Sequence, residues 1–394
     1  MLIRRVKKTA GRVFVTGLLS VLAACISAPP LAPGIGQPIP WSELSGWKDD
    51  RLAQAWPAFL NSCQKLPARD LQWKAICADA ALFAAPDDDT ARAFFETRFS
   101  AHPVTGNNGA SEGLITAYYE PLLQGSLTRT ERFRYPLYGR PDDLVVVDLG
   151  ELYPELQGKR FRGRLSGNRV VPYYSRAEIN HAPKPQRQPS PRPLAGRELV
   201  WVDDPVALFF LEIQGSGRVQ LTDGKIMHVG YADQNGHPYV AIGRKLVESG
   251  ALKLEEATLP AIRAWLTAHP DQAQALLNSN PSYVFFTLRE PEASGPTGAL
   301  NVPLVPERSI AVDPAFIPLG SPVWLDTTLP DNREPKPFRR LEFAQDTGGA
   351  IRGPARADLF LGFGEQAERL AGEMRQRGKL YVLLPAARAL SWNP

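Results

Sequence analysis

The sequence predicts an α+β fold that is mainly β and is organised in two lobes. Its 394 residues suffice for one large or two medium domains with a buried core. Proline contributes 37 of them, about twice the usual ~5%, and proline breaks helices and interrupts strand ladders. The apolar pattern runs from helices through mixed strands and a helical stretch to compact strands, without an internal repeat. Helical bundles and solenoids are therefore disfavoured.

The charge balance argues against a nucleic-acid-binding protein. Lys and Arg number 45 against 41 Asp and Glu, a net charge of +4. Five of these cations, and no acid, fall within residues 1–24: Arg4, Arg5, Lys7, Lys8 and Arg12. Without them 40 basic residues face 41 acidic ones. The basic excess belongs to the N-terminal segment, which excludes a strongly basic nucleic-acid binder.

Residues 1–24 have the features of an export signal. The apolar stretch 13–24 is shorter than the ~20 residues that span a bilayer, but it fits a secretory signal core. It ends in Leu-Ala-Ala before Cys25, which resembles the bacterial lipobox, whose cysteine becomes the lipidated first residue; an ordinary signal peptide with an incidental cysteine is the alternative. No Asp follows Cys25, which implies the outer membrane, on its periplasmic side. Residues 25–45 would be the lipidated cysteine and an extended tether.

Two cysteines remain in the exported chain, Cys63 and Cys77. In an oxidising compartment they most simply form a disulfide, worth roughly 3 kcal/mol for so short a loop. Two buried free thiols are the alternative. The histidines show no metal-ligand spacing, so we expect no metal and no cofactor. They are His102, His181, His228, His237 and His269.

The first helices are predicted between residues 50 and 100. Leu52, Trp56 and Phe59 recur at intervals of three and four, and residues 71–81 roughly follow the same period. Residues 87–89, three aspartates, would cap a third helix.

From Gly113 the pattern becomes β-like. Strands are predicted within 113–123, 144–150 and 198–221, and the proline-rich residues 182–196 read as a solvated loop. Helices follow within 240–247, 259–277 and 365–377. The late strands are predicted at 282–288, 309–314, 322–326, 341–346 and 380–385.

Three aspartates of the C-terminal third are the main candidates for chemistry: Asp313, Asp346 and Asp358. Each follows or approaches a predicted strand, among glycines that let a backbone approach a ligand closely. Cleaving a glycoside needs a carboxyl group that stays protonated near neutral pH, and neighbouring carboxylates raise each other's pKa. The plainer reading is that these aspartates cap turns and helices.

Two other enzyme classes fit poorly. Residues 346–348 read Asp-Thr-Gly, as in aspartic peptidases, but those need a matched second aspartate motif, and the chain has none. A phosphate-binding loop is also missing, because the glycine-rich stretches lack the Gly-Lys-Ser/Thr ending.

A set of short motifs resembles the MltA family of membrane-bound lytic murein transglycosylases over about residues 45–386. The motifs are AYYEP at 117–121, LEIQGSG at 211–217, GYA at 230–232 with NGH at 235–237, NPSYVFF at 280–286, and DTGGAI at 346–351 with Asp358. The resemblance implies a double-psi β-barrel domain built from residues 46–124 and 289–394, with N-terminal helices. A second β-domain, residues 125–288, would be inserted into it.

The resemblance also implies a reaction. The family cleaves the β-1,4 bond between N-acetylmuramic acid and N-acetylglucosamine of peptidoglycan without water, leaving a 1,6-anhydromuramic end. One aspartate acts as general acid and then as base, and that position maps to Asp358. Asp346 and Asp313 would be supporting carboxylates.

Further residues are candidates for substrate binding. The aromatic side chains of Tyr118, Tyr119 and Phe210 could stack on sugars, although strand aromatics more often belong to a core. Gln214, Gly215, Ser216 and Gly217 could face a glycan groove or form a tight turn. Gly348 and Gly349 could present backbone N–H groups to sugar oxygens.

A non-catalytic outer-membrane lipoprotein that binds peptidoglycan is the alternative function. The presence of all three aspartates favours the enzyme, because a non-catalytic descendant would be expected to lose one. We expect peptidoglycan glycan strands as the main partner, the outer membrane through the lipid anchor, and wall-synthesis or wall-degradation proteins beside them.

Overall fold

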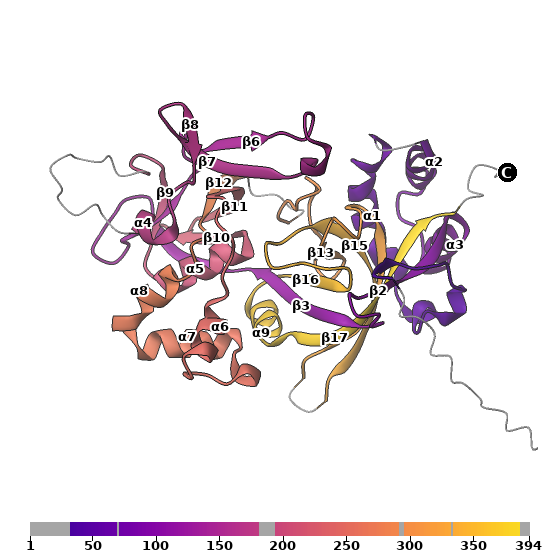
Figure 1. The fold of residues 1–394 in the computed structure, drawn as a ribbon. Coiled ribbons are helices and arrows are strands. Elements are labelled where there is room, and N and C mark those ends of the chain that lie inside the picture. The colour runs from indigo at the N-terminus through magenta and orange to yellow at the C-terminus, as the bar shows by residue number, and fades with distance from the viewer. Residues whose placement is uncertain (1–31, 69–70, 181–193, 291–294, 332–333, 387–394) are drawn as a thin grey trace, which may run out of the picture.

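The computed structural model describes residues 32–68, 71–180, 194–290, 295–331 and 334–386 (Figure 1). The predicted signal peptide, Cys25 and most of the proline-rich loop lie outside these residues. Within the described ranges no helix is both long and apolar enough to cross a bilayer.

Short helices form the N-terminal part, at the right of Figure 1. After the 3-10 turns η1 (Trp41–Glu43), η2 (Trp47–Asp49) and η3 (Leu52–Ala55) come α1 (Trp56–Cys63), η4 (Leu66–Ala68), α2 (Leu71–Ala80) and α3 (Asp88–Arg98). The helices predicted between residues 50 and 100 are thus confirmed. Their apolar sides share one core with Trp324 and Phe343 of the barrel. Cys63 and Cys77 form a disulfide that joins α1 to α2.

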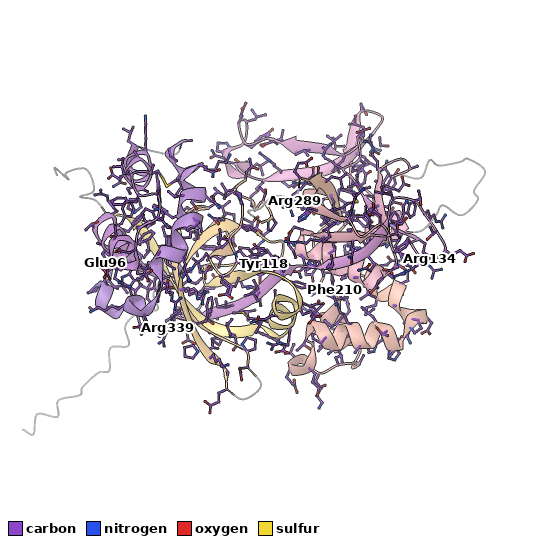
Figure 2. All side chains as sticks on the ribbon, turned by 180° about the vertical axis from the view of Figure 1, so that it is seen from behind. Glu96, Tyr118, Arg134, Phe210, Arg289 and Arg339 are labelled. Carbon is purple, nitrogen blue, oxygen red and sulfur yellow. A yellow bond between two sulfur atoms is a disulfide. The ribbon has the colours of Figure 1, made fainter. Side chains whose placement is uncertain are left out.

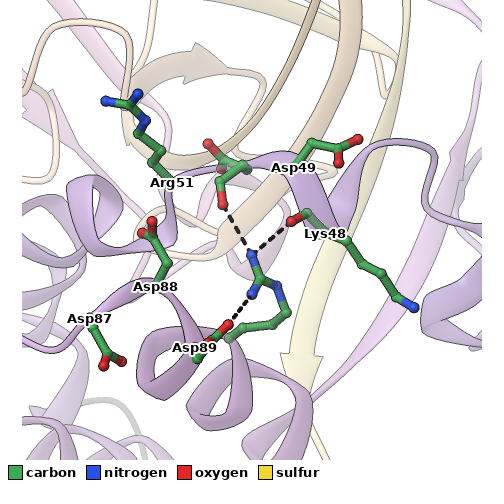
Figure 3. A pocket seen from close by; sticks show the side chains of 8 residues that line it. Lys48, Asp49, Arg51, Asp87, Asp88 and Asp89 are labelled. Carbon is green, nitrogen blue, oxygen red and sulfur yellow. Dashed lines mark hydrogen bonds and ion pairs between the residues drawn. The ribbon is translucent and has the colours of Figure 1, made fainter.

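The first turn of α3 is tied to the preceding turns around a pocket of about 450 Å³ (Figure 3). Asp87 accepts a hydrogen bond from Thr90 N at 2.8 Å, which confirms the predicted cap, and Asp88 accepts one from Ala53 N. Arg92 donates to Lys48 O, Asp50 O and Asp89. The aspartates of this pocket therefore hold backbone and arginine in place.

A closed six-stranded barrel follows the helices. Its strands hydrogen-bond around a ring in the order β3, β17, β14, β15, β13, β16 and back to β3. They are β3 (Gly113–Glu120), β13 (Ser309–Val312), β14 (Pro322–Leu329), β15 (Lys336–Asp346), β16 (Arg356–Phe363) and β17 (Arg375–Pro385). Apolar side chains from all six strands fill its interior, and α9 (Glu365–Glu373) adds Ala367 and Leu370. Outside the ring, β2 (Phe99–Thr105) pairs with β17, and β1 (Gly34–Ile35) pairs with β2.

The second body is a six-stranded sheet, at the left of Figure 1. Its strands run in the order β12 (Val284–Arg289), β11 (Ile226–Gln234), β10 (Ser216–Leu221), β4 (Leu122–Ser126), β9 (Glu198–Val202) and β5 (Tyr135–Tyr138). A three-stranded sheet is formed by β6 (Val145–Asp148), β7 (Arg160–Ser166) and β8 (Arg169–Val171). The helices here are η5 (Pro154–Leu156), α4 (Arg176–Asn180), α5 (Pro205–Gln214), α6 (Ile242–Glu248), η6 (Leu254–Glu256), α7 (Leu259–Ala268) and α8 (Pro270–Asn278).

The β-like stretch predicted over 198–221 is confirmed at its two ends, in β9 and β10, and is wrong in its middle, where α5 lies. Asp204 caps this helix through Val206 N, Pro205 occupies its first turn, and Gly215 ends it with φ 78°. The run VALFFLEI is apolar on all sides, so its periodicity does not separate a buried helix from a strand. The N-cap Asp204 and the C-terminal Gly215 therefore indicate that this run forms a helix.

Two predicted helices also need correction. The stretch 259–277 is two helices, because Pro270 has no N–H to continue the first and begins the second. The helix predicted over 365–377 ends at Glu373, and residues from Arg375 onward pair with β3.

Candidate active site

Two of the predicted aspartates lie in one row across the barrel wall. In the strand register Ala311 of β13 is opposite Asp346 of β15 on one side and Asp358 of β16 on the other. Asp358 is in turn opposite Thr116 of β3. The neighbouring residues Ile310 and Leu359 pack inside the barrel, so this row lies on its outer face. Asp346 and Asp358 are therefore separated by one strand, with the small side chain of Ala311 between them, and their carboxyl groups interact electrostatically.

Asp358 is held by a short chain of hydrogen bonds. The Thr116 hydroxyl donates to Asp358 Oδ1, and Arg356 Nη2 donates to Thr116 Oγ1 at 2.8 Å. Burial raises the pKa of Asp358, and the Arg356 charge and the Thr116 hydrogen bond oppose this increase only in part. Oδ2 has no hydrogen-bond partner among the residues that the structure describes. Asp358 can therefore carry a proton on Oδ2, the oxygen that has no hydrogen bond to a described residue.

Asp346 is held differently, by three donors. Tyr118 OH donates to Oδ2 at 2.8 Å, and the backbone N–H groups of Ala299 and Thr347 donate to Oδ1, each at 2.9 Å. Burial raises the pKa of Asp346 and the nearby Asp358 raises it further, while the three hydrogen bonds lower it. Burial and the two aspartates raise the pKa of Tyr118 well above its usual value, so Tyr118 remains a donor.

Asp313 follows β13 and organises a loop. Its Oδ1 accepts from Ala315 N at 3.1 Å and its Oδ2 from Gly353 N at 2.8 Å. Gly353 belongs to the segment that joins Asp346 to Asp358. Asp313 thus fixes the path of that segment.

Gly348 and Gly349 lie in the same segment. A Cβ on Gly348 would come within 2.8 Å of Ile351 Cγ1, so the turn admits only glycine without a shift. A Cβ on Gly349 would lie 3.9 Å from Tyr239 Cβ. Because Tyr239 precedes α6, this turn reaches from the barrel to the second body.

Several predicted sugar contacts are corrected by burial. Tyr119 packs inside the barrel and Phe210 packs among α6, α7 and α8, so neither ring is free to stack on a sugar. Figure 2 shows Phe210 beside the helices of the second body. The Tyr118 ring is buried as well, and its hydroxyl, rather than its face, serves the site. Tyr118 and Tyr119 lie on the strand β3, and Phe210 lies in the interface between helices. All three are buried, as the interpretation of these aromatic residues as core residues predicts.

The stretch 214–217 is the junction between α5 and β10. Gln214 Oε1 accepts from Tyr119 N at 3.0 Å, and Gly215 ends the helix. Ser216 and Gly217 are buried, with Gly217 against Leu211 and Pro121. The interpretation as a turn is closer to the structure, although the turn follows a helix, and the interpretation as a groove surface is wrong for Ser216 and Gly217.

Thr116 and Arg356 are site residues that the sequence reasoning missed. Arg356 is two residues before Asp358 in the same strand, so period-two spacing could have indicated it. Thr116 is 242 residues away and is brought in by the parallel pairing of β16 with β3, for which the sequence carries no local signal.

The arrangement can move a proton. Asp358 and Asp346 are two interacting carboxyl groups whose pKa values are both raised by burial, and such groups can hold and transfer a proton. In the described part of the chain no group of three His, Cys, Asp or Glu residues is placed to hold a metal ion.

Two family models match the chain. The MltA specific insert domain matches residues 114–287, and the 3D domain matches residues 308–384.

Known proteins match along much of the chain. Membrane-bound lytic murein transglycosylase A of Escherichia coli (strain K12) is 32% identical over 278 residues, which are 69% of this chain and 66% of that protein. The chain thus spans slightly less than two thirds of this curated relative. The structure of MltA from Neisseria gonorrhoeae is 35% identical with a TM-score of 0.73, and the match covers 93% of this chain and 100% of that one. E. coli MltA with bound chitohexaose is 26% identical with a TM-score of 0.65, covering 91% and 95%.

Proposed function

The chain belongs to the MltA family of lytic murein transglycosylases, and we propose that it cleaves the β-1,4 bond between N-acetylmuramic acid and N-acetylglucosamine in peptidoglycan without water. The observation that carries this proposal is the pair of carboxyl groups on the outer barrel face. Asp358 has the raised pKa and the free oxygen of a general acid, and Asp346 has the donors of a stable carboxylate.

Asp358 performs both proton transfers in this proposal. Protonated, it donates to the glycosidic oxygen as the bond to C1 breaks. Now a carboxylate, it takes the proton of the muramyl C6 hydroxyl, whose oxygen closes onto C1 and gives the 1,6-anhydro end. One carboxyl group suffices, whereas ordinary glycosidases use two, because the nucleophile is already part of the substrate.

Asp346 and its donors keep the proton on Asp358. Two neighbouring carboxyl groups resist joint ionisation, so the one with more donors takes the negative charge. Asp346 receives three hydrogen bonds and Asp358 receives one. The negative charge therefore belongs on Asp346, and Asp358 retains the proton until substrate arrives.

The remaining site residues have supporting roles. Asp313 holds the segment between the two acidic residues, and Tyr118 fixes Asp346 through its hydroxyl. Gly348 and Gly349 present backbone N–H groups to the sugar, at the point where their turn approaches Tyr239. Gln214 and Gly215 remain candidates for substrate binding in this proposal. They are half-buried near the start of β10, where a long glycan would pass.

The family membership extends to finer features of the fold. The closed six-stranded ring is, in this proposal, a double-psi barrel whose domain comprises residues 46–124 and 289–394, and residues 125–288 form the inserted domain. The pairing of β13 with β15 and of β16 with β3 in parallel, among antiparallel neighbours, supports it.

The chain is, in the same proposal, a lipoprotein of the outer membrane. Residues 1–24 would be removed as a signal peptide, and acyl chains on Cys25 would anchor the enzyme on the periplasmic side. The disulfide between Cys63 and Cys77 supports an oxidising compartment, and the curated E. coli relative named above is called membrane-bound. Its partners would be glycan strands and proteins of wall synthesis or degradation.

The test is to digest purified sacculi with the full chain and to examine the released muropeptides by mass spectrometry. We expect 1,6-anhydro products that disappear in Asp358→Asn. Hydrated reducing ends would instead indicate a hydrolase. No cleavage, together with retained binding to sacculi, would favour the alternative of a peptidoglycan-binding lipoprotein.

A further inference from the structure

The outer face of β3 continues beyond the two aspartates to a second charged cluster. Thr116, Tyr118 and Glu120 alternate along the strand and share this face. At about 3.3 Å per residue, Glu120 lies about 13 Å from Thr116. Glu120 Oε1 accepts from Arg289 Nη2 at 2.7 Å, and Oε2 accepts from Arg218 at 3.3 and 3.4 Å. Figure 2 labels Tyr118, in the middle of this face of β3, and Arg289, which belongs to the charged cluster.

A bulge in β16 brings an exposed aromatic ring to the same cluster. The register shifts between Phe360 and Phe363, and Phe363 lies opposite Glu120. Gly362 and Gly364 on either side have φ of 84° and 95°, values that glycine adopts without strain. Bulges of this kind re-aim a side chain. Here Phe363 is 61% exposed, and the guanidinium carbon of Arg218 lies 3.6 Å from its ring centroid.

The two arginines share the single carboxylate of Glu120, so these three side chains carry a net charge of +1, and Arg218 is the less closely paired arginine. Two arginines face one carboxylate, and Arg289 makes the short bond to it while Arg218 makes the long ones. His228 lies between Arg218 and Arg289 in the register, and burial and the Arg218 charge lower its pKa, so it is neutral and adds no charge. Arg218 Nη1 has no hydrogen bond to any described residue.

Such a site calls for a carboxylate ligand. Resting on the proposed function, the candidate substrate has a neutral glycan backbone, and its carboxylates lie on the peptide stems. We propose that Arg218, seated on Phe363, binds a carboxylate of a peptide stem that hangs from a sugar away from the bond being cleaved. An arginine fork pairs well with a carboxylate, and stacking on an aromatic ring holds that fork in place.

The test uses soluble chains of several disaccharide-peptide units in three forms: native, with stem carboxylates converted to methylamides, and with stems removed by an amidase. For the wild-type enzyme we expect KM to rise about tenfold on the methylamide form, with kcat unchanged. For Arg218→Gln we expect KM to be about as high on native chains as the wild-type KM on the methylamide form, and to stay at that value on the methylamide form. Phe363→Ala, whose exposed ring is not needed for folding, should raise KM on native chains by a smaller factor.

The controls separate this inference from the proposed function. Arg132→Gln removes another arginine that lies over an aromatic ring, Phe133, and should leave KM unchanged on every form. If Arg218→Gln raised KM relative to wild type by the same factor on native and on methylamide chains, the stem contact would be overturned and a contact with the glycan would be indicated. A loss by Arg218→Gln on the stem-free chains alone would indicate the lactyl carboxylate, which the amidase exposes, instead of a stem carboxylate. Absence of anhydro products from wild type on all three forms would overturn the proposed function itself.

Discussion

The barrel has two acidic clusters that differ in burial and in hydrogen bonding. On the outer face, Asp358 and Asp346 are half-buried and hydrogen-bonded. Inside the wall, Glu342 is fully buried next to the Arg308–Asp50 ion pair, and neither of its oxygens has a hydrogen-bond partner among the described residues. Burial raises the pKa of Glu342 to about 8, and the pKa values of both aspartates are raised as well.

The comparison shows that a raised pKa does not identify a catalytic group. Glu342 is fully buried and makes no hydrogen bond to any described residue, whereas Asp358 is half-buried and has a free oxygen, a hydroxyl partner and a neighbouring carboxyl group. Access and partners decide the role. The outer cluster should therefore control rate, and the inner cluster should control stability.

The largest expected effect is on rate, from Asp358→Asn. The amide keeps the shape and the Thr116 contact but cannot donate the acidic proton, so kcat should fall by about 10³-fold or more. Anhydro-muropeptide release followed by mass spectrometry measures it. Thermal unfolding should remain near wild type, because the amide replaces a protonated carboxyl group of nearly the same size. A variant that unfolds early would mean that Asp358 is structural, like the inner cluster.

The next largest effect is on stability, from Asp50→Asn. Asp50 accepts two hydrogen bonds from Arg308, at 2.7 and 2.8 Å, and one from Leu341 N. Removing one partner of a buried ion pair leaves the other charge unpaired, which typically costs about 3–5 kcal/mol. Denaturant unfolding measures this loss, and the kcat of the remaining folded enzyme should be unchanged. A rate defect without a stability defect would contradict the division of roles.

A smaller effect on rate is expected from Tyr118→Phe. Without the hydroxyl, Asp346 loses one of three donors and ionises less readily, so it repels a charge on Asp358 less. The pKa of Asp358 then falls, and the alkaline limb of the pH–rate profile should move to lower pH, with kcat reduced about tenfold at neutral pH. Tyr119→Phe serves as the control, because Tyr119 packs inside the barrel. An unchanged limb would mean that Asp346 does not tune Asp358.

The sequence predicted the parts of these clusters that depend on local pattern. Asp313, Asp346 and Asp358 were recognisable through their strand ends and glycines, and Asp87 was recognisable as a helix cap. Thr116 was missed because its contact with Asp358 depends on a parallel pairing 242 residues apart. The exposed Phe363 was missed because a bulge, and not the alternation of the strand, sets its direction.

The inner cluster was missed for a related reason. Asp50, Arg308 and Glu342 read as ordinary surface residues in the sequence, since charged residues are rarely buried without a partner. Only the packing of the turns before α1 against β15 removes them from water. The helix α5 within the β-like stretch 198–221 was also missed, because an apolar run alone does not distinguish a buried helix from a buried strand.

The smallest effect on rate, and the sharpest test of the comparison, is expected from Glu342→Gln. The folded pKa of about 8 lies above the ordinary value of 4.5, so the folded state holds a proton that the unfolded state releases. Stability is therefore fully present below about pH 4.5 and declines as pH rises towards 8, by at most about 1.4 kcal/mol per pH unit. The glutamine does not titrate, so its melting temperature should lose this slope between pH 5 and 8. The pH–rate profile should stay that of wild type, because Glu342 does not contact the substrate. A shifted profile would show that the inner cluster also influences the rate, and would contradict the division of roles between the two clusters.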